Sequence, residues 1–333
     1  PDICDNTRII EIGQTSMKQQ TFATGDFEHY RKPTRREQFL TEMDKIVPWS
    51  ELCAQIEPFY PKVGNGRPLV GLERMLRIYV LQHWFTLSDP GAEEALYESR
   101  SMCRFAGIDL GREPVPDEST ILNFRHLLER HELGEPLFQA VGEYLQAQGL
   151  HIASGTIVDA SIISAPSSTK NKDKARDPEM HSTRKGNQWY FGMKAHIGVD
   201  SKTKQIHSVA ATAANVHDSQ VLEDLLHGKE TRVWGDSAYT GQTDVMRRTA
   251  PCAQDFTHEK GCRNQSLDEA AKARNRTKSK VRAKVEHVFG IMKRVFGFTK
   301  VRYRGLTKNA HALFVLCALT NLYLARRRLQ CLA

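Results

Sequence analysis

Apolar runs long enough to cross a membrane and closely spaced cysteine pairs are both missing from this sequence of 333 residues. The longest apolar stretch, residues 310–324, is interrupted or bounded by polar side chains and falls short of the roughly 20 residues that span a bilayer. We therefore expect no membrane partner. The seven cysteines are odd in number and form no C-x-x-C pair, which disfavours a disulfide framework and favours a reducing, cytoplasmic compartment.

Acidic residues are almost absent from residues 272–304. This segment holds twelve Lys or Arg residues and one acid, Glu286. The whole chain carries a formal charge of +8, with a pI near 9.1, and such a balance favours a polyanionic partner. Because the positive charge is clustered, nucleic acid is a better candidate than a membrane surface. The basic face predicted to hold a DNA backbone includes Lys278, Lys280, Arg302 and Arg304.

The spacing of apolar residues predicts a helix over residues 277–295. Its apolar stripe contains Val281, Val285, Val288, Met292 and Val295. The same projection places Ser279, Glu286 and Lys293 beside Arg282, along one edge of the stripe. Two interpretations stay open for this edge. It holds either a weak surface ion pair between Arg282 and Glu286, or a carboxylate ligand for a divalent cation that lies next to an anion.

The first half of the chain has helical periodicity throughout. We expect helices over residues 34–60, 72–84, 92–105, from Asp117 or Ser119 to about 128, and 134–148. Residues 93–131 could form a helix-turn-helix that turns Asn123, Arg125 and His126 toward DNA. An ordinary helical bundle is at least as consistent with the pattern. Residues 1–16 are polar, lack periodicity and precede the first methionine, so we expect a poorly ordered extension.

Strand patterns begin after residue 150. Strands are predicted over 155–163, 190–199, 206–213 and 231–234, with a long polar loop over 164–188. Helices are expected over 218–226, 241–249 and 309–328. This order predicts a mixed sheet whose first three strands are antiparallel and whose fourth is parallel to the first. The expected fold class is therefore α+β or α/β, with a helical domain over 17–150 and a mixed-sheet domain over 151–333.

Two aspartates stand out in the strand region. Asp159 lies in the middle of an otherwise apolar strand, and Asp236 follows directly after another. Either one alone could be structural. If the two strands are neighbours, however, both carboxylates can lie together, and the late helix can add Glu286. Three converging carboxylates repel one another unless metal neutralises them, and a site of hard oxygen ligands selects Mg²⁺ or Mn²⁺. Two such ions, roughly 4 Å apart, could catalyse phosphoryl transfer on DNA.

Several motifs together resemble one known family. They are IVDAS at 157–161, GDSAYTG at 235–241 and the run Arg282-x3-Glu286-x6-Lys293. They are similar to the DDE transposases of bacterial insertion sequences, and most similar to insertion-sequence family five. Residues 87–108, 116–133, 176–200 and 215–219 also resemble that branch, so the resemblance extends over residues 17–329.

The resemblance implies a ribonuclease H-like catalytic core and a bacterial, nucleoid-associated DNA transposase. Asp159, Asp236 and Glu286 would be the catalytic metal ligands, and Arg282 and Lys293 would contact DNA. Such an enzyme would cleave 3′ ends at terminal inverted repeats and join them to double-stranded target DNA, working as a homodimer or a larger assembly. One departure is Ser279, which stands where the family places Tyr. An alternative is therefore a catalytically impaired or repurposed sequence-specific DNA-binding protein.

Overall fold

The N-terminal part of the protein is a bundle of short helices. The computed structural model describes residues 32–62, 69–150, 155–172, 174–261 and 267–331, so the predicted extension over 1–16 lies outside the described residues. The bundle contains α2 (Arg35–Asp44), α3 (Trp49–Ile56), η1 (Glu57–Phe59), α4 (Leu72–Phe85), α5 (Asp89–Glu98), α6 (Arg100–Phe105), α7 (Glu118–Arg130) and α8 (Gly134–Ala147).

Local capping explains where these helices begin. Asp117 accepts a hydrogen bond from the Thr120 amide at 2.8 Å and is therefore the cap of α7. The single helix predicted over 92–105 is wrong. Ser99 has an extended backbone, ends α5, and caps α6 through the amide of Met102. The side chain of Ser99 replaces the helical hydrogen bonds that would have joined the two segments.

A mixed sheet forms the second part of the protein. Its strands are β1 (Gly155–Ser164), β2 (His181–Lys185), β3 (Gln188–Asp200), β4 (Ile206–Ala213), β5 (Arg232–Trp234) and β6 (Gln254–Asp255). From β4 the sheet runs through β3, β1 and β5 to β6. The pairs β4–β3 and β3–β1 are antiparallel, whereas β1–β5 and β5–β6 are parallel. This topology confirms the predicted pairing and is a ribonuclease H-like core.

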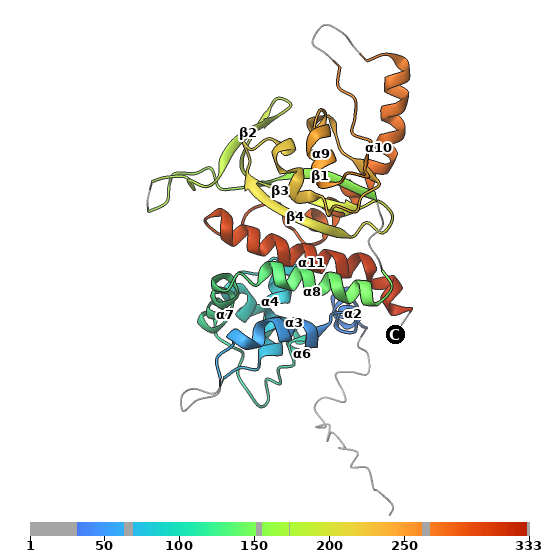
Figure 1. Ribbon diagram of the computed structural model, residues 1–333. Helices are drawn as coiled ribbons and strands as arrows, with labels where there is room; N and C mark the ends of the chain where they lie inside the picture. Colours follow the sequence, from blue (N-terminus) through green and yellow to red (C-terminus); the bar gives the residue numbers. More distant parts are fainter. Residues whose placement is uncertain (1–31, 63–68, 151–154, 173, 262–266, 332–333) are drawn as a thin grey trace, which may run out of the picture.

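Strand β2 was not expected, because residues 164–188 read as a polar loop. It pairs with β3 across a tight turn at Gly186 and Asn187, where Gly186 has a φ of 62°. Glycine adopts this left-handed backbone without steric cost. The result is a two-stranded arm that extends beyond the body of the sheet (Figure 1).

The predicted late helix begins earlier than expected and changes pitch near its end. Helix α10 (Glu269–Gly290) is capped by Asp268 and continues into a π-helical turn, η5 (Ile291–Val295). A π-turn holds more residues than an α-turn and rotates the residues that follow it. Consequently Val295 is 47% exposed and Phe296 is buried in its place, so the prediction that Val295 belongs to the buried stripe is wrong.

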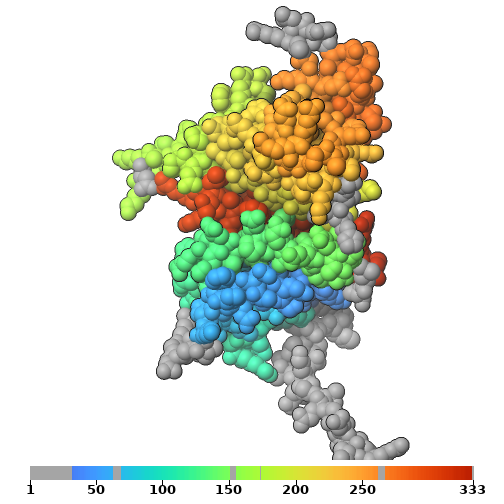
Figure 2. Space-filling view, viewed as in Figure 1, coloured from blue at the N-terminus to red at the C-terminus, as the bar shows by residue number. Residues whose placement is uncertain are grey.

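Helix α11 (Leu306–Gln330) joins the two parts. It crosses the middle of the molecule beside α8 and under β4 (Figure 1), and most of its central residues are buried. The Asn321 amide accepts a hydrogen bond from the Ile206 amide and donates one to the Ile206 carbonyl, at 2.8 and 2.7 Å. In space-filling view α11 appears as a red band between the helical bundle and the sheet (Figure 2). The remaining short elements are η2 (Asp218–Val221), η3 (Glu223–Leu225), η4 (Ser237–Tyr239) and α9 (Thr243–Thr249).

The helices that the structure describes include none with the length and apolar character needed to cross a membrane.

Candidate active site

Asp159 and Asp236 lie level with each other on neighbouring parallel strands. The last pair in the β1–β5 register is Ile157 with Trp234, and each aspartate stands two residues further along its chain. Asp159 accepts a hydrogen bond from the Ala160 amide at 2.9 Å. Asp236 accepts one from the Ala238 amide at 2.8 Å and so caps η4. The backbone therefore fixes both carboxylates at the point where β1 and β5 separate.

Burial makes Asp159 an unusual carboxyl group. It raises the pKa of Asp159 to about 6, and the nearby Asp236 charge acts in the same direction. The Arg282 guanidinium and the Ala160 amide lower this pKa and offset part of the effect. Desolvation is the larger influence because only 14% of the side chain is exposed. The fold thus holds Asp159 in a position that disfavours its own negative charge.

Helix α10 brings Arg282 and Glu286 to the same place. One guanidinium nitrogen of Arg282 lies 3.2 Å from Asp159 Oδ2, and another lies 2.8 Å from Glu286 Oε1. The i,i+4 pair between Arg282 and Glu286 is therefore present, and Arg282 also reaches the buried aspartate, whereas the role of Glu286 as a metal ligand stays a prediction. Glu286 keeps 59% of its side chain exposed. The arginine now spans two of the three predicted catalytic carboxylates.

These residues line one cavity of about 700 Å³. Its acidic side chains come from β1, from the end of β5, from η2 and from α10. They are surrounded by cations from the β2 arm, from β3 and from η5. The acids are Asp159, Asp218, Asp236 and Glu286, and the cations are Arg184, Lys185, Lys194, Arg282, Lys293 and Arg294.

Lys293 reaches this cavity from the π-turn. Its ammonium donates to the Ile162 carbonyl of β1 at 2.8 Å. Burial lowers the pKa of Lys293, and the positive charge of Lys185 adds to the effect. Sequence reasoning placed Lys293 next to Arg282 by assuming a regular helix. The structure brings both to the same cavity, although the helix is not regular between them.

Other predicted DNA contacts point elsewhere. Lys278 donates to the Thr257 carbonyl at 2.8 Å, and Ser279 Oγ lies 3.2 Å from His258 Nε2. Both are half-buried on the side of α10 that faces the segment after β6. Lys280 and Arg304 are exposed, as a DNA contact requires.

The structure corrects the proposal that Arg125 contacts DNA. Arg125 is buried, and it pairs with Asp89 at 2.9 Å and Glu129 at 2.7 Å while lying over the Tyr303 ring. Its neighbour Phe124 is buried as well, whereas Asn123 is exposed and His126 is half-buried.

Arg302 is also engaged internally. It donates to the Gln82 carbonyl of α4 at 2.9 Å, and burial lowers its pKa. The positive charge of Arg302 therefore helps to join the segment before α11 to the helical bundle.

Two features of the site were missed at the sequence level. The β2 arm supplies Arg184 and Lys185, and the turn signal Gly186–Asn187 between two alternating segments could have revealed it. The second feature is the pair of Lys194 and Asp218, whose charged atoms lie 2.8 Å apart. No local sequence pattern predicts that pair, because β3 and η2 are brought together only by the tertiary fold.

Two transposase family models match the chain. One, described as "Transposase DDE domain", matches residues 151–322, which is more than half of the sequence. The chain belongs to the DDE transposase family. The other, described as "Transposase domain (DUF772)", matches residues 28–127. A DDE transposase uses divalent metal ions and acts on DNA as a rule of its family.

One similar solved structure is a piggyBac transposase synaptic complex with hairpin DNA. It is 10% identical to this transposase over 90% of this chain and 77% of the other, with a TM-score of 0.44.

Proposed function

We propose that this DDE transposase cleaves DNA at the terminal inverted repeats of its own element and joins the 3′ ends to target DNA. The observation that carries the proposal is the single cavity in which Asp159, Asp236 and Glu286 lie among cations from three other elements. Carboxylates suit metal-assisted phosphoryl transfer, and the cations suit the phosphates beside it. The motifs at 157–161, 235–241 and 282–293 support the further assignment to bacterial insertion-sequence family five.

The donor set fits Mg²⁺ or Mn²⁺, and we propose two ions. Three carboxylates without thiols provide the hard oxygen ligands that these metals prefer. Among the residues described, no three His, Cys, Asp or Glu side chains are yet close enough to hold a metal. Arg282 accounts for this, because its guanidinium lies between Asp159 and Glu286 as their present counter-ion. When bound, the metals would activate a water or a 3′-hydroxyl and stabilise the leaving oxygen.

The residues of the chain have separate roles around that chemistry. Asp159 and Asp236 form a backbone-fixed pair, whereas Glu286 stands on the exposed side of α10, where it can reorient. Lys185 of β2 and Arg294 of η5 both line the cavity, and together they can hold a phosphodiester backbone. When a DNA phosphate binds, Arg282 can exchange a carboxylate for that phosphate. Both anions can accept two parallel hydrogen bonds from the guanidinium group.

The decisive test is strand cleavage by Asp236→Asn. The substrate is a duplex that carries the inverted repeats that the proposed function requires on either side of the gene, with Mg²⁺ as the metal. We expect cleavage to fall by a factor of about 10³ or more, because a catalytic metal ligand is lost, while DNA affinity changes less than about threefold. Asp244→Asn is the matched control, because the Asp244 side chain is fully exposed on α9.

Cleavage retained by Asp236→Asn would refute the proposed catalytic set. If the wild-type protein binds the repeats but never cleaves them in Mg²⁺ or Mn²⁺, the alternative of a non-catalytic DNA-binding protein holds. We propose a homodimer or larger assembly on paired ends, and the mass of the protein–DNA complex in light scattering tests it.

A further inference from the structure

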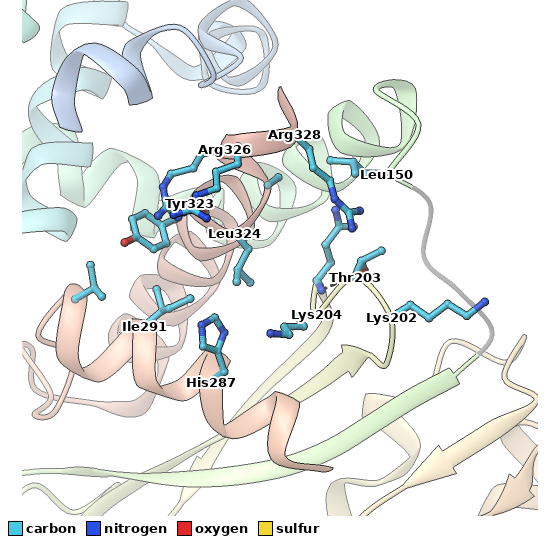
Figure 3. A pocket seen from close by; sticks show the side chains of 14 residues that line it. Leu150, Lys202, Thr203, Lys204, His287, Ile291, Tyr323, Leu324, Arg326 and Arg328 are labelled. Atoms are coloured by element: carbon cyan, nitrogen blue, oxygen red, sulfur yellow. Dashed lines mark hydrogen bonds between the residues drawn. The ribbon is translucent and has the colours of Figure 1, made fainter. Parts of the chain in front are cut away.

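A second basic cavity, of about 510 Å³, lies on a different side of α10 from the catalytic one. It is enclosed by the turn between β3 and β4, by α10 with η5, and by the last turns of α11 (Figure 3). Its cationic side chains are Lys202, Lys204, Arg326, Arg327 and Arg328, and the His287 imidazole also lines it. Among the described residues that line it, none is an aspartate or a glutamate. In this respect it differs from the catalytic cavity, which has four acids.

The cations of this cavity are poorly neutralised by the protein. Within the described part of the chain, none of Lys202, Lys204, Arg327 and Arg328 has a carboxylate within ion-pair distance. Arg326 instead donates to the Tyr323 carbonyl at 2.6 Å and lies over the Tyr323 ring. A cluster of like charges without counter-ions raises the free energy of the protein until an anion binds.

The floor of the cavity is apolar, and its rim is charged. Ile291 and the exposed Val295 come from the π-turn, and Leu324 comes from α11. Arg327 and Arg328 extend from the exposed face of α11 toward the rim. An extended polymer of alternating sugars and phosphates matches this arrangement, since sugars pack on apolar surface while phosphates take the cations. The open, exposed rim also permits a long chain to enter and leave.

We propose that this cavity, lined by the β3–β4 turn and the end of α11, binds the phosphodiester backbone of a second stretch of duplex DNA. The inference rests on the proposed DNA function and adds a contact surface outside the catalytic cavity. His287 and Glu286 are adjacent on α10 yet line different cavities, so that one helix separates the two DNA contacts. The π-turn contributes to both, with Lys293 on one side and Val295 on the other.

The test is a charge reversal, Arg327→Glu with Arg328→Glu, measured by fluorescence anisotropy on a duplex of about 40 base pairs without metal. We expect affinity at about 0.1 M salt to fall tenfold or more. We also expect the slope of log affinity against log salt to decrease by about 2, because each phosphate contact contributes about 0.9 to that slope. Arg327→Lys with Arg328→Lys should retain both affinity and slope.

The matched control is Lys62→Glu with Arg247→Glu. It makes the same change in net charge at two exposed positions outside both cavities. An equal loss of affinity in this control, or an unchanged salt slope in the Arg327/Arg328 variant, overturns the inference. So does a change in the mass of the DNA-free protein without a change in DNA affinity, because the cavity would then bind a second copy of the chain. Cleavage is not used as the readout, so failure of the proposed catalytic function would be seen separately, in the Asp236→Asn experiment.

Discussion

At the scale of single residues, Asp159 shows how the catalytic role that we propose for it opposes stability. The strand core forces a carboxylate into a mostly desolvated position, and one arginine only partly compensates for it. A carboxyl group whose pKa is raised on folding lowers the stability of the protein at pH values above its folded-state pKa. This cost disappears as the pH falls to the pKa of the group in the unfolded chain. For Asp159 this cost develops over the pH range between its ordinary pKa of 3.8 and its folded-state pKa of about 6.

We therefore expect Asp159→Asn to raise the melting temperature at pH 7.5 and to leave it unchanged near pH 4. The upper limit of the gain is about 3 kcal/mol, from a shift of roughly two pKa units at about 1.4 kcal/mol each. Loss of the Arg282 contact reduces the gain, although Arg282 keeps Glu286 as a partner. Thermal denaturation at the two pH values measures the effect.

Asp244→Asn is the control, because it makes the same chemical change at a fully exposed side chain. A melting temperature for Asp159→Asn that is lower than wild type at pH 7.5 would contradict this account. It would mean that the ion pair with Arg282 outweighs desolvation.

At the scale of elements, the β2 arm connects the backbone geometry of its turn to the DNA contact that we propose. Gly186 sits at the turn with a φ of 62°, and a β-carbon there would meet no atom within 4 Å. The cost of a bulkier residue is therefore backbone strain alone, of roughly 1–2 kcal/mol. Arg184 and Lys185 lie beside this turn and line the proposed catalytic cavity. We therefore expect distortion of the arm to weaken DNA binding.

Gly186→Val should weaken DNA binding and slow cleavage several-fold while the melting temperature of the protein changes little. The arm extends from the sheet and contributes little to the core, so its local stability is separable. Gly186→Asn is the control, since Asn tolerates the left-handed region far better than Val. If both variants bind DNA like wild type, the arm does not hold the substrate.

Elements with strong periodicity could be predicted from the sequence, whereas tertiary effects on them could not. The nearly continuous apolar run of β1 and the order of the strand patterns predicted the sheet and its pairing, and with it the placing of Asp159 and Asp236 on neighbouring strands. The burial of Arg125 was not predictable, since Asp89 lies 36 residues away and meets it only after α5 and α7 pack. The π-turn could not be predicted from the sequence either, because a helical projection assumes a constant angle per residue.

At the scale of the whole molecule, helix α11 unites the helical bundle and the sheet. One continuous apolar core contains residues of α4, α8, β3 and α11, and Val285 of α10 belongs to it as well. Residues of the two predicted domains, 17–150 and 151–333, thus share one apolar core. A second, smaller core under β5 contains Val233 and Tyr239 and supports the strand that presents Asp236. The position of the proposed catalytic carboxylates relative to the helical bundle consequently depends on the packing of α11.

Asn321→Ala tests this dependence. Asn321 is buried and satisfies both the amide and the carbonyl of Ile206 at the start of β4. Its loss would leave two buried backbone groups without partners, at a cost of about 1–3 kcal/mol for each. We expect a lower melting temperature with one cooperative transition, seen equally by tryptophan fluorescence and by far-ultraviolet circular dichroism. Gln330→Ala, at the exposed end of the same helix, should leave the transition unchanged. Two separate transitions in Asn321→Ala would instead show that the bundle and the sheet fold as independent domains, because α11 would then stabilise one part without the other.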